Sequence, residues 1–153
     1  MIDITRKPTV YREAKAKGLI KLKPETISRI LEGKIEKGDP LQISKIAGIM
    51  AAKNTSQIIP LCHPIPISHV DIITKIVSND TIKVESTVKS TAKTGVEMEA
   101  LTATTLTLLT IWDMTKKYEK NKSGQYPTTE VSSVHVEYKK RTQTKDKFRK
   151  TAK

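Results

Sequence analysis

Residues 69–90 read HVDIITKIVSNDTIKVESTVKS, and apolar and polar side chains alternate on both sides of the short polar turn at 78–80. Alternation with a period of two puts the apolar side chains of a strand on one face. Two such runs joined by Ser, Asn and Asp are typical of an antiparallel hairpin. The sequence therefore predicts paired strands at 69–77 and 81–90 with one buried face.

Further helices and strands are predicted around this hairpin. Two shorter helices are predicted to begin at Pro24 and Pro40, because proline suits the first helical position. Asp39 is a suitable N-cap for the second of them. The other predicted elements are a strand at 10–22, helices at 24–33, 40–53 and 96–118, and a strand at 130–140. This order predicts an α+β sandwich whose helices pack on one face of a mainly antiparallel sheet.

Helical periodicity also predicts which side of each short helix is buried. For the helix at 24–33 the expected buried residues are Ile27, Ile30 and Leu31. For the helix at 40–53 they are Leu41, Ile43, Ile46, Ala47, Ile49 and Met50. Two prolines make residues 61–68 an extended or turning loop.

Length and charge indicate one domain followed by a basic tail. The chain has 153 residues, of which 37% are apolar, enough for a sizeable core. Of the net charge of +12, residues 139–153 contribute +7 and the remainder +5. We predict one catalytic domain at 1–138 and a flexible tail at 139–153, either solvated or bound to an anionic partner. The net charge of +5 on residues 1–138 gives a positive electrostatic field that suits a polyanionic small molecule.

Several features indicate a cytoplasmic location. No apolar run reaches the roughly 18 residues that cross a bilayer, and the first residues do not resemble a signal peptide. The single cysteine, Cys62, excludes an intrachain disulfide and a multi-cysteine zinc site. His63 and His69 lack metal-ligand spacing, so no metal site is expected. Because no apolar run is long enough, no membrane association is expected either.

The long helix carries acids and lysines near its ends. Residues 95–122 read GVEMEALTATTLTLLTIWDMTKKYEKNK, in which Lys116 and Lys117 follow Asp113 by three and four residues. Either lysine can meet the acid on one helix face. The pair is either a surface ion pair worth less than about 1 kcal/mol or a functional one, in which Asp113 orients Lys116 as a general acid or phosphate clamp.

At the other end of this helix, Glu97 and Glu99 flank Met98. Acids in a first turn answer the helix dipole, which needs no functional role. Glu99 and Asp113 are 14 residues apart, about 21 Å at 1.5 Å per residue. If both act in one site, the substrate is long or a second chain completes the site.

Two other segments contain candidate site residues. Cys62 and His63 are neighbours, so in an extended loop their side chains point apart and the imidazole is a poor base for the thiol. Such a loop instead suits recognition of a heterocycle by hydrogen bonds. Lys37 precedes a glycine in a turn, where it is either solvated or close to a ligand.

Two long segments resemble the MoaC family, molybdenum cofactor biosynthesis protein C. These are IAGIMAAKNTSQIIPLCHPIPIS at 46–68 and KTGVEMEALTATTLTLLTIWDMTKK at 93–117, and MIDIT at 1–5 and KGD at 37–39 fit the same family in order. The resemblance covers roughly residues 1–138. It implies a ferredoxin-like domain in a homo-hexamer, a trimer of dimers, with the active site at a subunit interface.

The resemblance also implies an activity, that of a cyclic pyranopterin monophosphate synthase, a phosphorus-oxygen lyase. Its substrate is (8S)-3',8-cyclo-7,8-dihydroguanosine 5'-triphosphate, its product is a pterin, and pyrophosphate leaves. No protein cofactor is implied, and magnesium bound to the triphosphate stays open. The catalytic residues of the family match Asp113, Lys116 and Lys37. The substrate-binding residues match Leu61, Cys62, His63, Glu97, Met98, Glu99, Lys53, Arg12 and Lys122.

A rival interpretation is a basic RNA-binding α+β module without enzymatic activity. The chain has only six aromatic residues, and no predicted strand carries the aromatic pair that stacks bases. Acids at 97, 99 and 113 would also repel a phosphate backbone. We therefore expect no nucleic acid on the body of the protein.

Overall fold

A computed structural model describes residues 1–142, and residues 143–153 lie outside this described part. The elements are β1 (Val10–Lys21), α1 (Pro24–Leu31), α2 (Pro40–Lys53), α3 (Thr55–Ile58), β2 (Ile67–Ile76), β3 (Thr81–Ala92), α4 (Glu97–Glu119) and β4 (Glu130–Thr142). Their order along the chain confirms the predicted arrangement, with α3 as an unpredicted short addition.

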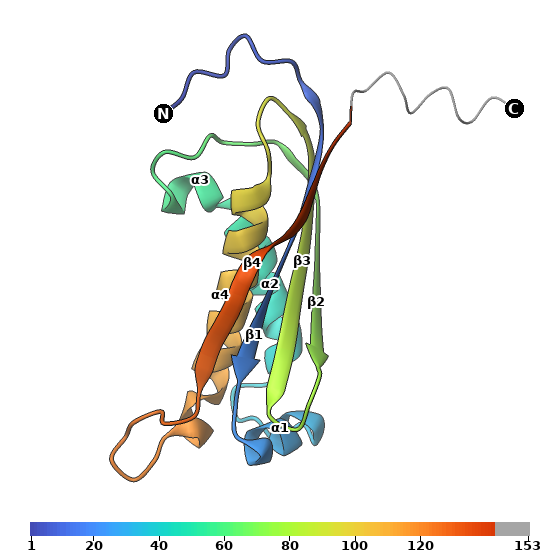
Figure 1. Cartoon of the computed structure of the whole chain (residues 1–153). Coiled ribbons are helices and arrows are strands. Elements are labelled where there is room, and N and C mark those ends of the chain that lie inside the picture. The colour runs from blue at the N-terminus through green and yellow to red at the C-terminus, as the bar shows by residue number, and fades with distance from the viewer. Residues whose placement is uncertain (143–153) are drawn as a thin grey trace, which may run out of the picture.

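The four strands form one sheet in the order β2-β3-β1-β4, and every neighbouring pair is antiparallel. Helices α2 and α4 lie side by side against this sheet, as Figure 1 shows. This is the ferredoxin-like topology, because the long helix α4 connects β3 to β4 and the hairpin β2–β3 flanks β1. The predicted α+β sandwich is confirmed.

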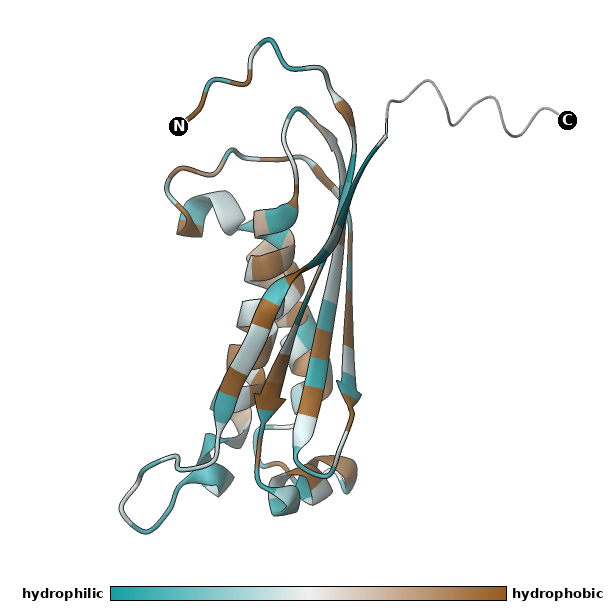
Figure 2. Cartoon of the chain, viewed as in Figure 1, coloured by the Kyte–Doolittle hydropathy of each residue, from teal (hydrophilic) through white to brown (hydrophobic). Residues whose placement is uncertain are grey.

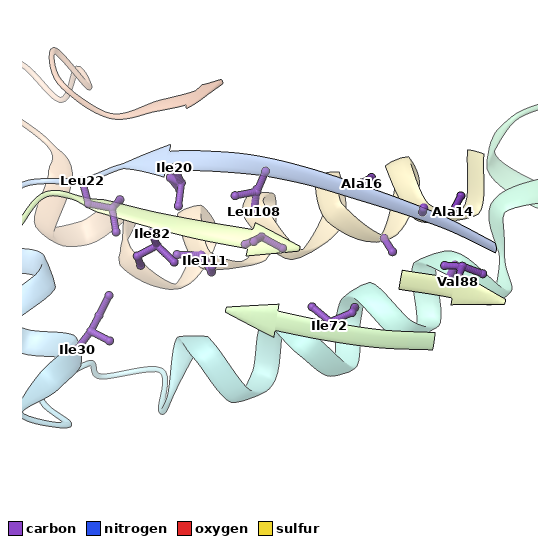
Figure 3. Close-up of a cluster of buried hydrophobic side chains, with 14 of the residues drawn as sticks. Ala14, Ala16, Ile20, Leu22, Ile30, Ile72, Ile82, Val88, Leu108 and Ile111 are labelled. Atoms are coloured by element: carbon purple, nitrogen blue, oxygen red, sulfur yellow. The ribbon is translucent and has the colours of Figure 1, made fainter. Parts of the chain in front are cut away.

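The core lies between the sheet and the two long helices. Apolar and polar residues alternate along β3 in Figure 2, and its residues Ile82, Val84 and Val88 are fully buried. Figure 3 shows Leu108 and Ile111 of α4 among the side chains of the strands. The period-two pattern thus reports the buried face correctly, because each strand is covered on that face only.

The predicted buried side of α2 is wrong for three of its six residues, whereas Leu41 and Ile49 are partly buried against the core. Ile46 and Met50 are 61% and 58% exposed, and Ile43 is exposed as well. The residues that are buried are mostly small ones, namely Ser44, Gly48, Ala51 and Ala52. The two helices approach so closely at Gly48 that large side chains do not fit between them, since helix separation depends on the side chains at the contact.

We expect a valine at Gly48 to destabilise the fold by about 1–3 kcal/mol or more. A Cβ atom there would lie 2.2 Å from Thr107 Oγ1, 2.4 Å from Ile72 Cδ1 and 3.1 Å from the carbonyl oxygen of Ala103, which leaves no room without a shift of α4. Urea unfolding measures the change in unfolding free energy. Valine at the exposed Gln42 of the same helix is the control, and an equal loss in both variants would contradict this interpretation.

Two smaller expectations are also corrected. Leu31, predicted to be buried in α1, is 71% exposed because it lies in the last turn, past the side that contacts the core.

Residues 139–142, predicted to begin the flexible tail, are the end of β4 and pair with Tyr11–Ala14 of β1. Backbone pairing along a sheet edge needs no apolar side chains, so composition did not reveal it. The rest of the predicted tail lies outside the described residues.

The two ends of α4 lie at opposite ends of the molecule (Figure 1). One end carries α1 and the turn that follows it, and the other carries α3, the loop before β2 and the N-terminal segment. Within residues 1–142, no helix has the length and apolar character needed to cross a membrane.

Candidate functional site

At the C-terminal end of α4, Asp113 pairs with two lysines. Its Oδ1 lies 2.7 Å from Lys116 Nζ, and its Oδ2 lies 2.6 Å from Lys37 Nζ. Lys37 also donates to the Asp113 carbonyl at 3.1 Å. Lys37 comes from the turn before α2, which the capping of α2 by Asp39 keeps in place. The structure thus brings together the three predicted catalytic residues beside a pocket of about 330 Å³.

This pairing sets the charges of the cluster. Hydrogen bonds from Lys116 and Lys37 lower the pKa of Asp113 to about 2, so the carboxylate is ionised at every pH at which enzymes usually work. Asp113 in turn raises the pKa of Lys116. The Lys116 side chain is therefore an ammonium at neutral pH, ready to donate a proton or hold an anion and not to accept a proton.

One turn of α4 also holds the loop that carries Lys37. The Tyr118 hydroxyl accepts a hydrogen bond from the Glu36 backbone N–H at 3.0 Å, and Lys117 forms an ion pair with the Glu36 carboxylate. These contacts fix the residue that precedes Lys37. Sequence reasoning considered Lys117 only as a partner of Asp113 and missed Tyr118, because its partner is distant in the chain.

Beyond Tyr118, a buried acid joins α4 to α1. Glu119 is fully buried and accepts hydrogen bonds from the Lys23 N–H at 3.1 Å, from Thr129 at 2.5 Å and from Thr26. The Lys23 ammonium donates to the carbonyls of Tyr118 and Lys120 at the end of α4. The Glu119 side chain thus binds the backbone at the start of α1, and the Lys23 side chain binds the backbone at the end of α4. These mutual contacts fix the end of α4 that carries Asp113 and Lys116.

The opposite end of α4 lines a second pocket, of about 210 Å³. Its walls include the predicted substrate-binding residues Leu61, Cys62, His63, Met98 and Glu99. The N-terminal segment forms another wall, because His63 Nε2 is 2.8 Å from the Ile2 carbonyl oxygen. Burial, and then the charge of Glu99, raise the pKa of Cys62, the opposite of what a nucleophilic thiolate requires.

Glu99 is the most constrained group of this pocket. It is 3% exposed, and its Oε2 has no hydrogen-bond partner within the described chain. Burial, opposed by a hydrogen bond from its own backbone N–H and reinforced by the charge of Glu97, raises the pKa of Glu99. A buried carboxyl oxygen that lacks a partner is costly, which favours a ligand with N–H donors beside Oε2.

We expect Glu99→Gln to be more stable than the wild type near pH 8. The folded-state pKa of Glu99 is raised, so its contribution to stability is intact below the unfolded value near 4.5 and is lost as the pH rises through the folded value. Glutamine does not ionise, so the thermal unfolding midpoints of the two proteins should diverge with rising pH. Parallel curves from pH 4 to 8 would show that Glu99 is not strained by burial.

Of the remaining predicted site residues, only Arg12 and Glu97 lie beside one of the two pockets. Arg12 and Glu97 line one hollow beside the second pocket. No hydrogen bond or ion pair in the described chain joins Lys53 or Lys122 to either cluster. Within residues 1–142, no three His, Cys, Asp or Glu side chains gather as a metal-ion site.

A ferredoxin-like domain with two lysines on one acid and a separate pocket around a buried acid has the features of an enzyme that binds a small molecule. Comparison with known proteins makes this specific. The chain matches the MoaC family over residues 1–142. It is 58% identical over 136 residues to a probable cyclic pyranopterin monophosphate synthase of Saccharolobus solfataricus, covering 89% of this chain and 91% of the relative.

A relative of the same name from Pyrococcus horikoshii is 56% identical over 142 residues, covering 93% of this chain and 89% of the relative. Another, from Sulfolobus acidocaldarius, is 56% identical over 136 residues, covering 89% and 94%. The chain therefore belongs to the MoaC family. The predicted family, its lyase class and the role in molybdenum cofactor biosynthesis are confirmed at this level.

Proposed function

We propose that this protein converts (8S)-3',8-cyclo-7,8-dihydroguanosine 5'-triphosphate to cyclic pyranopterin monophosphate and releases pyrophosphate. Membership of the MoaC family and the names of the relatives support this substrate and product. The observation that carries the mechanism is the pairing of Lys116 and Lys37 on Asp113. A cytoplasmic location is part of the proposal.

The two clusters are proposed to act as one site across a subunit interface. They lie at opposite ends of a 23-residue helix, too far apart to hold one small substrate in a single chain. Between them α4 exposes Leu109, and α2 exposes Ile46 and Met50. Exposed apolar side chains on neighbouring helices are typical of a protein interface.

A two-fold axis across this helix layer would complete the site. Met98 and Leu109 are 11 residues apart, about three turns, and Asp113 is one turn further, so all three share one exposed side of α4. A two-fold partner packed on that side runs antiparallel and places its Asp113 near Glu99 of the first chain. Such dimers, assembled in threes as the proposed hexamer, contain the composite site.

In this site Lys116 is the proposed proton donor. Opening the reduced purine ring and closing the pyranopterin ring move protons on and off nitrogen and oxygen. An ammonium held by an ionised Asp113 delivers such protons in a fixed direction. Lys37 shares the same carboxylate and is available to stabilise the negative charge that develops on the reacting phosphate.

The pocket around Glu99 is proposed to bind the ring system. A guanine-type ring presents two adjacent N–H donors, and the partnerless oxygen of Glu99 is a suitable acceptor. His63 and the backbone of Leu61 and Cys62 supply further hydrogen-bonding groups at the same wall. Met98 contributes apolar contact only, so we propose that it matters less than Glu99.

Closing the cyclic phosphate requires an internal hydroxyl to attack the α-phosphorus while pyrophosphate departs. Cations must surround the leaving oxygens in that step. Arg12 lies beside the ring pocket and is the best-placed candidate, while Lys53 and Lys122 keep this role only as predictions. Magnesium on the triphosphate is compatible with this scheme, and we assign no protein ligand to it.

The direct test is to incubate the purified protein with the cyclic dihydro-GTP intermediate. Release of pyrophosphate and formation of the pterin, oxidised to its fluorescent form, are measured together. We expect equal amounts of both products, and neither from Lys37→Ala. A folded protein that releases neither product would refute the proposed reaction while leaving the family assignment intact.

A further inference from the structure

A basic hollow of about 420 Å³ lies where β1 and β4 meet the start of α4. Within the described chain it is lined by five cations and one acid, namely Lys7, Arg12, Lys93, Lys139, Arg141 and Glu97. Four of these cations were not among the predicted site residues. The excess of four positive charges is suited to an anion with several negative charges, such as a di- or triphosphate.

Two arginines of this hollow lie directly opposite each other. Arg12 of β1 and Arg141 of β4 are cross-strand partners, and like charges in this position destabilise a sheet. Arg12 Nε is buried without a hydrogen-bond partner in the described chain, and Arg12 Nη2 makes only a 3.5 Å hydrogen bond to the Lys93 carbonyl. An anion between the two guanidinium groups would relieve both the repulsion and the missing hydrogen bond.

Glu97 places one negative charge at the edge of this hollow. Its Oε1 is 2.9 Å from Lys139 Nζ, and its carboxylate folds back over Gly95 at the first turn of α4. Burial acts to raise the pKa of Glu97, but hydrogen bonds from Lys139 and from its own backbone N–H outweigh burial and lower it. The positive end of a helix favours an anion at this position, and here the chain supplies its own.

The hollow is continuous with the ring pocket of the same chain. Lys7, Thr94 and Gly95 line both of them. We propose that the hollow binds the triphosphate of the substrate through Arg12, Arg141 and Lys139, and that the phosphates displace Glu97 from Lys139. The identity of the ligand as a substrate rests on the proposed function, but the affinity of the hollow for polyphosphate does not.

The first test measures binding of inorganic tripolyphosphate to the full-length protein by calorimetry at one fixed salt concentration. Arg141→Ala and Lys139→Ala should each weaken binding by about 10- to 100-fold. Lys75→Ala, at an exposed lysine of β2 outside the hollow, is the charge-matched control and should bind as the wild type does. Equal affinities in Arg141→Ala and Lys75→Ala would overturn the proposal, and circular dichroism spectra verify that each variant is folded.

The second test uses Glu97→Gln, which removes the internal counter-ion and keeps the shape of the side chain. Tripolyphosphate should bind about tenfold more tightly to this variant, because it no longer competes with a carboxylate for Lys139. Unchanged or weaker binding would show that Glu97 is not displaced by phosphate. A short single-stranded RNA that outcompetes tripolyphosphate, phosphate for phosphate, would overturn the assignment to a small molecule.

Turnover separates this proposal from the proposed function. If Arg141→Ala raises KM for the cyclic dihydro-GTP intermediate about 10-fold or more with kcat nearly unchanged, the hollow binds the substrate's triphosphate. If the wild type binds tripolyphosphate but converts no intermediate, the proposed reaction fails and the anion site stands. If turnover is normal and KM is unaffected in Arg141→Ala, the reaction stands and the hollow does not bind the substrate's triphosphate.

Discussion

Replacing Lys116 by alanine should lower kcat by about 10²- to 10⁴-fold, while the free energy of unfolding stays close to that of the wild type. Lys116 and Asp113 are both about half exposed, so their ion pair adds little to stability. The loss of activity would come from the missing proton donor. Steady-state kinetics on the cyclic dihydro-GTP intermediate and urea unfolding measure the two quantities.

Lys34→Ala is the matched control for this experiment. Lys34 is also exposed and also lies 2.7 Å from an acid, Glu32, but it is not part of either cluster. It should keep normal activity. If Lys116→Ala is as active as Lys34→Ala, the ion pair of Lys116 is only a surface feature and the acid–base assignment is wrong.

Asp113→Asn gives a pH signature for the same assignment. Asp113 raises the pKa of Lys116, so its neutralisation should move the alkaline limb of the kcat profile to lower pH. The ionisation of Asp113 itself, with a pKa of about 2, should not appear between pH 5 and pH 9 in the wild type. An acidic limb assigned to Asp113 in that range would contradict its ion pairs with Lys116 and Lys37.

The second large effect is recovery of activity by mixing two inactive variants. Lys116→Ala and Glu99→Gln each remove one half of the proposed composite site, and each should be inactive as a pure protein. When they are unfolded together and refolded at equal concentrations, half of the two-fold interfaces should be mixed, and each mixed interface holds one composite site with an intact Lys116 and an intact Glu99, so about a quarter of all sites are restored. Activity should therefore return to about a quarter of the wild-type value.

Mixing Lys116→Ala with Asp113→Ala serves as the control. Both residues belong to one chain's cluster, so no mixed interface contains an intact pair and activity should stay absent. Light scattering of the refolded samples establishes whether chains have assembled. Assembled Lys116→Ala and Glu99→Gln mixtures without activity would show that the two ends of α4 do not act in one interfacial site.

Local pattern was sufficient for most of the fold. Alternation at 69–90 predicted the β2–β3 hairpin, and Pro40 with Asp39 as its N-cap predicted where α2 begins. These signals are local because strand and helix periods arise from the backbone of each segment. The ion pair of Asp113 and Lys116 was predictable for the same reason, since side chains three residues apart in a helix lie on the same face.

The tertiary structure alone decided which faces meet and which distant residues become neighbours. Ile43, Ile46 and Met50 have the hydrophobicity of a buried face, yet the close approach of α2 to α4 at Gly48 turns them outward. The sequence by itself determined every helix and strand except the short α3, their order and the MoaC family. It did not determine that Lys37 reaches Asp113 or that Arg12 faces Arg141, because such pairings depend on the packing of whole elements against each other.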